Sequence, residues 1–198
     1  MGVALSCRTP RGAPWQAYLR ARARQLERAL ALGCTEISLA LVDDAEMRAL
    51  NRAYRGVDRT TDVLAFPLRE KVDGSAARGR RVVRARAACG APRPDGLAAH
   101  LSGGGPAARL LGDVVISIDT AAAQARAGHV PLAARLDVLL IHGVLHLLGY
   151  DHEVSAAEAR RMARRARALR AVLAVEPSVT GRSGARGRPV ARRSRIVR

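Results

Sequence analysis

Three histidines within eleven residues are the strongest chemical signal in this chain of 198 residues. The run 142–152 reads H-G-V-L-H-L-L-G-Y-D-H. His142 and His146 are four residues apart, so on a helix their side chains lie on one face, one turn from each other. Gly149 is expected to end that helix, and the turn that follows can bring His152 back toward the same face. This spacing predicts a metal site.

Three neutral imidazoles without a fourth protein ligand are typical of a catalytic zinc site with an open position. Nickel or copper can also occupy such a set of nitrogen ligands. Unpaired imidazoles would be costly to bury on a helix so rich in Leu and Val. We therefore expect one Zn²⁺ per chain at His142, His146 and His152, and we interpret His100 and His129 as surface histidines.

Gly143 occupies the position that holds the general base in peptidases with an H-E-x-x-H motif. The peptidase machinery is therefore incomplete, and we expect the missing side chain to leave room for a bulky substrate near the ion. An ion held by the three histidines could still activate a bound water, although no general base can be assigned. Asp151 is expected either to orient a ligand imidazole or to stabilise its own turn.

Helical and strand patterns alternate around this motif. They predict an α+β or mixed α/β fold, with a small mixed sheet packed against about five helices. The predicted helices cover 14–32, 45–54, 119–127, 131–148 and 155–174, and the predicted strands cover 37–42, 62–66 and 113–118. The expected N-caps are Asp43 or Asp44, then Asp119 or Thr120, and finally Ser155 in a capping box with Glu158.

The charge of the chain is strongly positive and uneven. The formal net charge is +17, and two segments rich in Gly, Ala, Pro and Arg, 69–110 and 176–198, carry much of it. Because neither has useful apolar periodicity, we interpret 69–110 as a flexible insertion and 176–198 as a disordered basic tail. Such a cation should associate with polyanions. The six arginines of the predicted helix 155–174 are read as a solvated face, with a phosphate-facing surface as the alternative.

Other composition signals restrict the class of protein. Five aromatic residues are too few for a base-stacking platform, so any contact with nucleic acid should depend on phosphates. Three widely spaced cysteines form no disulfide framework. The chain shows neither a signal peptide nor an apolar stretch long enough to cross a bilayer. We expect a cytoplasmic protein without a membrane partner.

The histidine run resembles the signature of the YbeY family of bacterial endoribonucleases, H-G-x-L-H-L-x-G-Y-D-H. Two further segments match that family in order: L-N-R-A-Y-R-G-V-D-R-T-T-D-V-L-A-F-P at 50–67 and L-G-D-V-V-I-S-I-D-T at 111–120. The resemblance covers about 14–68 and 111–175. It implies a zincin-like α+β fold, with a catalytic domain over 1–175 and a single metal on the three histidines.

The resemblance also implies a function and a further site residue. The expected activity is that of a single-strand-specific, zinc-dependent endoribonuclease, which matures the 3′ end of 16S ribosomal RNA and acts in ribosome quality control. Ribosomal RNA and the small ribosomal subunit are the implied partners, and we expect a monomer. Arg55 would act beside His142 in catalysis by gripping RNA phosphate. Its alternative role is to bond the last carbonyls of helix 45–54.

Two departures from the family pattern stand out: Thr60 replaces the usual Pro, and Ala65 the usual Ser. The first should loosen the turn into the strand, and the second removes a hydroxyl. Two other functions stay open. A zinc metallopeptidase would take its carboxylate base from elsewhere in the chain. A non-catalytic ribosome-associated RNA-binding factor would use the metal structurally and the Arg-rich segments as its working parts.

Overall fold

The computed structural model describes residues 3–33, 35–68 and 109–175. The predicted basic tail lies outside the described residues, and so does the predicted insertion except for its last two residues. Those two residues begin a strand, four residues before the strand predicted at 113–118. The predicted domain boundary at 175 therefore stays a prediction.

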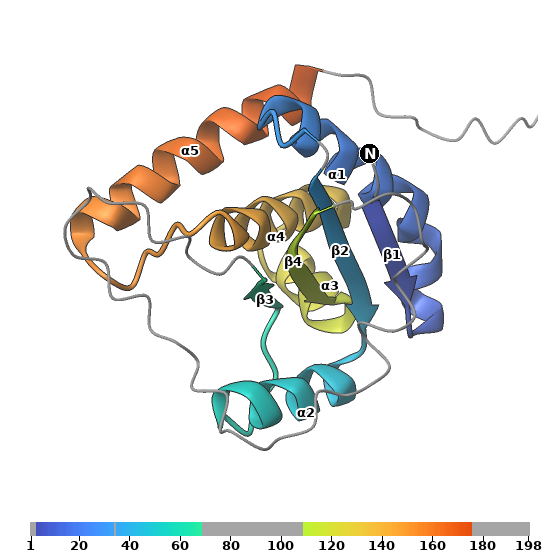
Figure 1. Cartoon of the computed structure of the whole chain (residues 1–198). Helices are drawn as coiled ribbons and strands as arrows, with labels where there is room; N and C mark the ends of the chain where they lie inside the picture. The colour runs from blue at the N-terminus through green and yellow to red at the C-terminus, as the bar shows by residue number, and fades with distance from the viewer. Residues whose placement is uncertain (1–2, 34, 69–108, 176–198) are drawn as a thin grey trace, which may run out of the picture.

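In the described part of the chain, four strands form one mixed sheet in the order β1-β2-β4-β3. Strands β1, β2 and β4 are parallel, and β3 pairs antiparallel with β4 at one edge (Figure 1). This arrangement confirms the predicted small mixed sheet. The strands are β1 (Val3–Cys7), β2 (Thr35–Val42), β3 (Val63–Pro67) and β4 (Arg109–Ser117).

The described ranges hold five α-helices around the sheet, as predicted, with ends within a few residues of the predicted ranges. A short 3-10 helix, Pro10–Trp15, precedes the first of them. The helices are α1 (Gln16–Ala29), α2 (Asp44–Arg55), α3 (Ile118–Ala127), α4 (Leu132–Leu147) and α5 (Ala156–Val175).

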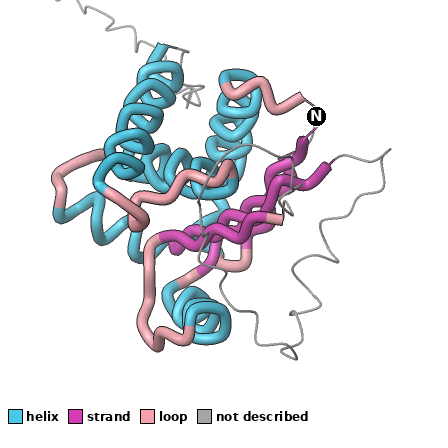
Figure 2. The backbone as a smooth tube through the Cα atoms, turned by 60° about the vertical axis from the view of Figure 1, so that its left-hand side comes forward, coloured by secondary structure: helices cyan, strands magenta, loops and turns pink. Residues whose placement is uncertain are grey.

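The sheet lies between two apolar cores because successive side chains of a strand point to opposite faces. On β2, Leu39 and Leu41 enter the larger core, which α1, α4 and α5 complete. Ala40 and Val42 enter the smaller core beneath α2. Figure 2 shows the resulting layers, with α2 on one side of the sheet and the other helices on the opposite side.

Two local expectations differ from the structure. Strand β1 was not predicted, because a run of five residues gains its pairing only from the distant β2. The N-cap of α3 is Ser117, and neither Asp119 nor Thr120 holds that position. The Ser117 hydroxyl accepts a hydrogen bond from the Thr120 amide at 3.1 Å. The Asp43 cap of α2 is confirmed, since its carboxylate accepts from the Glu46 amide at 2.8 Å.

Candidate metal centre

Helix α4 positions the first two histidines. The apolar residues on one side of this helix, among them Leu136, Leu140 and Val144, are fully buried against the sheet and the neighbouring helices. His142 and His146 lie one turn apart on the remaining face and are half-buried. The helix that carries them is thus fixed by its own core packing.

A tight turn after α4 returns the chain toward this face. Gly149 adopts a φ of +84°, a left-handed conformation that glycine reaches without steric cost. The Tyr150 amide donates back to the Leu145 carbonyl at 3.0 Å. The Asp151 carboxylate accepts from the Glu153 amide at 2.9 Å, which is the turn-stabilising role expected of it. Its expected role in orienting an imidazole stays a prediction.

The three imidazoles converge as the spacing predicts. One nitrogen from each of His142, His146 and His152 lies within 4.8 Å of the other two. The Nε2 atoms of His142 and His146 are 3.0 Å apart. The ring centroids are separated by 4.6 to 5.3 Å. Among the described residues, these histidines form the only group of three or more potential metal ligands that meets in this way.

The protonation state of this cluster suits a metal. Burial, followed by repulsion from His146 and His152, lowers the pKa of His142 to about 4. Burial also lowers the pKa of His146. Both rings are therefore neutral at pH 7 and can offer lone pairs. A tetrahedral ion with Zn–N bonds of about 2.0 Å separates its ligand nitrogens by roughly 3.3 Å. The 3.0 Å between the Nε2 atoms of His142 and His146 is already close to that separation.

A polar cluster that the sequence analysis did not identify lies beside His142. Arg135 donates to the Asp62 carboxylate at 2.9 Å and to the Gln124 side chain at 2.8 Å. Gln124 donates to Asp62 in turn, at 3.1 Å. Asp62 raises and Arg135 lowers the pKa of His142, which places both charges near the ring. One member of this cluster could have been predicted from the sequence. Arg135 is seven residues before His142 and therefore lies on the same face of the helix.

The turn that leads into β3 is held by the Asp44 carboxylate. Thr60, which stands where the family usually has Pro, donates its hydroxyl to Asp44 at 3.2 Å. The same oxygen accepts from Ser117 at 2.5 Å and from Thr120 at 2.6 Å. These bonds lower the pKa of Asp44 although burial opposes the shift. The Thr60 hydroxyl thus supplies a contact that proline could not make.

Arg55 lies in the last turn of α2 with an exposed side chain. Gly56 ends that helix with a φ of +68°, and its amide donates to the Arg52 carbonyl at 3.1 Å. Within the described part of the chain, the Arg55 guanidinium makes no hydrogen bond or ion pair. The alternative role of bonding the last carbonyls of α2 is therefore not seen there. The expected contact with phosphate stays a prediction.

The expectation for Gly143 was wrong. Gly143 is buried against the sheet, and a Cβ atom at this position would come within 2.6 Å of Val114 Cγ1 on β4. The glycine therefore allows α4 to pack closely on β4, and it leaves no room for substrate. A glutamate here would point at the sheet, so the missing side chain reflects helix–sheet packing.

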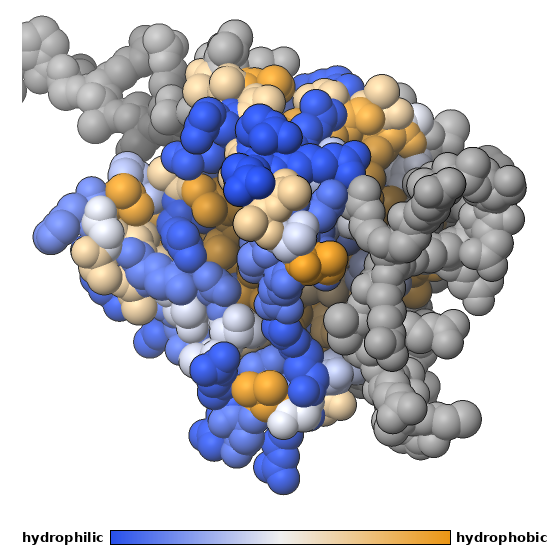
Figure 3. Space-filling model, turned by 90° about the vertical axis from the view of Figure 1, so that its left-hand side faces the viewer, coloured by the Kyte–Doolittle hydropathy of each residue, from blue (hydrophilic) through white to orange (hydrophobic). Residues whose placement is uncertain are grey.

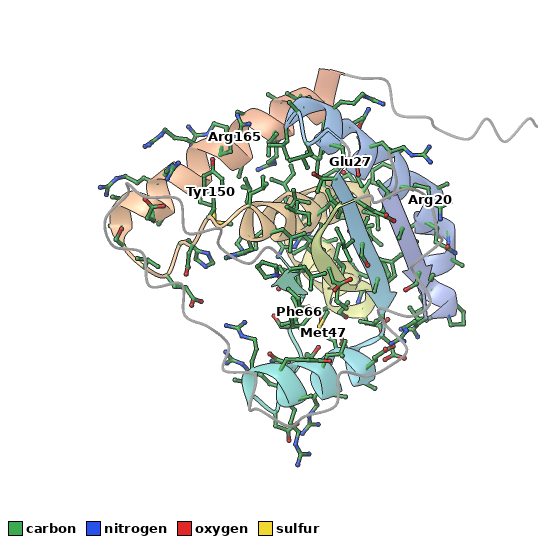
Figure 4. All side chains as sticks on the ribbon, in the orientation of Figure 1. Arg20, Glu27, Met47, Phe66, Tyr150 and Arg165 are labelled. Atoms are coloured by element: carbon green, nitrogen blue, oxygen red, sulfur yellow. The ribbon has the colours of Figure 1, made fainter. Side chains whose placement is uncertain are left out.

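Side-chain placement around the site is visible in Figure 4. Tyr150 lies between the end of α4 and α5, while Phe66 and Met47 lie between β3 and α2.

His129, expected at the surface, is exposed in the loop before α4. His100 lies outside the described residues. None of the described helices is long and apolar enough to cross a membrane.

Comparison with known proteins identifies the family. The family described as "Endoribonuclease YbeY" matches residues 14–174. A protein of that name from an Anaeromyxobacter species is 45% identical over 165 residues, which cover 83% of this chain and 68% of the relative. Another from Geobacter metallireducens is 36% identical over 174 residues, covering 87% and 96% of the two chains.

A solved structure supports the fold. The solution structure of a Thermotoga maritima protein superimposes with a TM-score of 0.52 and covers 87% of this chain and 89% of its own. Its sequence is 22% identical, so this likeness concerns the fold alone. The family match and the relatives carry the assignment: this chain belongs to the endoribonuclease YbeY family.

Proposed function

We propose that this protein is a metal-dependent endoribonuclease that hydrolyses phosphodiester bonds in single-stranded ribosomal RNA, including the 3′ end of 16S ribosomal RNA. The observation that carries the proposal is the convergence of three imidazoles, two of them held neutral by burial, on the helix and turn of the family signature. The relatives named as endoribonucleases support the reaction class.

His142, His146 and His152 would hold the metal, and zinc is the ion that their donor set favours. When bound, the ion would supply Lewis-acid chemistry, polarising a phosphate oxygen or activating water. The chain contributes the positions of the ligands. Because α4 is fixed by its buried face, the two helical imidazoles are held in place before any ion or substrate arrives.

Arg55 would supply the cation that grips the phosphate undergoing cleavage. Its guanidinium is exposed and makes no ion pair with the described residues, so no internal bond must break before it binds an anion. A guanidinium can hold two phosphate oxygens at once and can offset the charge that develops during cleavage.

The environment of Gly143 favours a nuclease over a peptidase. The position that carries the general base in an H-E-x-x-H peptidase faces Val114 in this fold and has no space for a side chain. A peptidase would therefore need its base from another element. The strongly positive net charge of +17 also suits a polyanionic substrate.

The proposal extends to partners and location. A protein acting on this RNA would meet the small ribosomal subunit in the cytoplasm. We propose that it does so as a monomer, since the three metal ligands all come from one chain.

Chelation and reloading test the metal-dependent reaction. Purified protein is stripped with a chelator and reloaded separately with zinc, nickel and copper, and each sample receives single-stranded RNA, duplex RNA and casein. We expect cleavage of single-stranded RNA to disappear on chelation and to return with zinc. Casein cleavage without RNA cleavage would support the peptidase. Salt-sensitive RNA binding without cleavage of either substrate would support the non-catalytic binding factor.

A further inference from the structure

Helix α5 presents a positively charged face to solvent. Its apolar residues Met162, Leu169 and Leu173 are buried against the core. Glu158 is the single acidic residue of the helix. Six arginines, all exposed, cover the side of the helix away from the core: Arg160, Arg161, Arg164, Arg165, Arg167 and Arg170. We call this set the α5 arginine face.

This face begins beside the turn that carries His152. The Arg161 guanidinium lies over the Tyr150 ring, 5.2 Å from its centroid. Tyr150 is two residues before His152, so this cation–π contact joins the first turns of α5 to the turn that carries the third histidine. Figure 4 shows Tyr150 beneath the part of α5 that carries Arg165.

The other end of α5 is fixed as well. Arg22 of α1, whose side chain is nearly buried, donates to the Leu173 carbonyl at 2.9 Å and lies 3.4 Å from the Asp137 carboxylate of α4. Since α5 is held at both ends and along its apolar side, the arginine face keeps a fixed position relative to α4 and its histidines. The arginines run from Arg160 to Arg170, so the face extends about 15 Å along the helix.

Most of the charge on the face is uncompensated. Arg161 lies 3.7 Å from Glu158, a weak and exposed pair. Within the described residues, Arg160, Arg164 and Arg167 make no hydrogen bond or ion pair. Figure 3 shows hydrophilic residues gathered at the height of α5 and again at the height of α2 on this side of the molecule.

We propose that the α5 arginine face binds the phosphate backbone of the RNA strand that leads away from the metal centre. The inference rests on the proposed function and adds a second contact region to it. A row of guanidinium groups matches the repeated negative charge of a strand. No aromatic side chain lies among these arginines on α5. Binding should therefore depend on the phosphate charge of the strand and not on its base sequence.

The test compares two double variants with equal loss of charge. Arg164→Gln with Arg167→Gln removes two cations from the face. Arg24→Gln with Arg126→Gln removes two exposed cations elsewhere, on α1 and α3. Arg24 is two residues from Arg22 and therefore points away from α5. Both pairs are placed in a His146→Ala background so that bound RNA is not cut, and binding of a long single-stranded RNA is measured across a series of salt concentrations.

We expect the first pair to lower the slope of log affinity against log salt by about 1.4, since each lost phosphate contact on a single strand contributes about 0.7. The control pair should leave the slope close to its starting value. A short RNA that spans the metal centre alone should bind equally to both pairs. Equal slopes for the two pairs on the long RNA would overturn the α5 assignment.

Cleavage by the metal-loaded wild type is measured alongside. Its absence would contradict the proposed function, whereas equal slopes in a protein that cleaves RNA would contradict only this inference.

Discussion

At His142 and His146, burial removes the water that would solvate a protonated imidazole, and the pKa of each ring falls below its usual 6.5. The lowered pKa values make the free energy of unfolding depend on pH. An unfolded chain protonates its histidines near pH 6.5, while folded His142 resists protonation until about pH 4. Between these two pH values the unfolded state binds more protons, so acid favours unfolding.

The metal-free protein should therefore lose stability as the pH falls from about 6.5 toward 4. Urea unfolding of chelated protein at pH 7.5 and pH 5 measures this effect, and we expect a lower midpoint at pH 5. His142→Gln should reduce the difference between the two midpoints, because one of the two suppressed imidazoles is gone. The matched His129→Gln variant, at an exposed loop position, should keep it. An unchanged difference in His142→Gln would contradict the assignment of the effect to this ring.

Gly143 should prove to be a packing position. Gly143→Ala places a Cβ within 2.6 Å of the buried Val114 side chain and should cost about 1–3 kcal/mol in the free energy of unfolding. In a Val114→Ala background the same substitution should cost nothing or stabilise, since alanine favours helix. Chemical unfolding of the four proteins checks this. An equal cost in both backgrounds would show that the Val114 contact is not the cause.

The sequence predicted the chemistry at this scale better than the packing. The four-residue spacing and the helix-ending glycine were enough to bring His142, His146 and His152 together. The face on which Gly143 lies depends on how α4 is rotated against the sheet, and that rotation is set by long-range packing. The Asp62–Arg135–Gln124 cluster joins three separate elements, and local spacing relates only Arg135 to the histidine face of α4.

Among the elements, α5 depends on one polar contact across the core. Arg22 is 8% exposed and bonds the Leu173 carbonyl near the end of α5, while also neutralising the half-buried Asp137. Burial raises the pKa of Asp137, and Arg22 opposes that shift. The contact therefore joins three helices by way of one guanidinium.

Arg22→Met should destabilise the protein by about 3 kcal/mol, because it leaves a carboxylate and a carbonyl without their cation. Adding Asp137→Leu should recover much of the loss, since the isolated charge is then removed. Thermal and chemical unfolding of both variants measure these changes. If Asp137→Leu recovers no stability, the unpaired carboxylate is not the cause. The loss would then come from the Leu173 carbonyl and from the lost packing of Arg22 on Tyr18.

Elements with their own periodicity and caps could be predicted from the sequence. The starts of helices α2 and α5 are predicted by Asp43 and Ser155. Each of these side chains accepts a hydrogen bond from an amide in the first turn of its helix. Strand β1 could not be predicted in this way. Its residues gain their structure from parallel pairing with β2, whose partner residues lie 34 positions further along the chain, and such pairing leaves no local pattern.

For the whole molecule, the metal should act as a stabilising ligand. An ion that binds the folded chain at one hundred times its Kd adds about 2.7 kcal/mol to the free energy of unfolding. Saturating zinc should therefore raise the unfolding midpoint of the wild type and leave His152→Ala nearly unchanged. A calorimetric scan with and without zinc measures both. An equal rise in the two proteins would indicate that zinc binds elsewhere.

The most direct test of the central claim measures metal content and RNA cleavage in the same samples. Wild type, His146→Ala and the surface control His129→Ala are purified free of contaminating nucleases. The account predicts about one metal ion per chain in the wild type and the control, with cleavage of single-stranded RNA in both, and the loss of metal and cleavage together in His146→Ala. Full cleavage by a His146→Ala protein that holds no metal would contradict it.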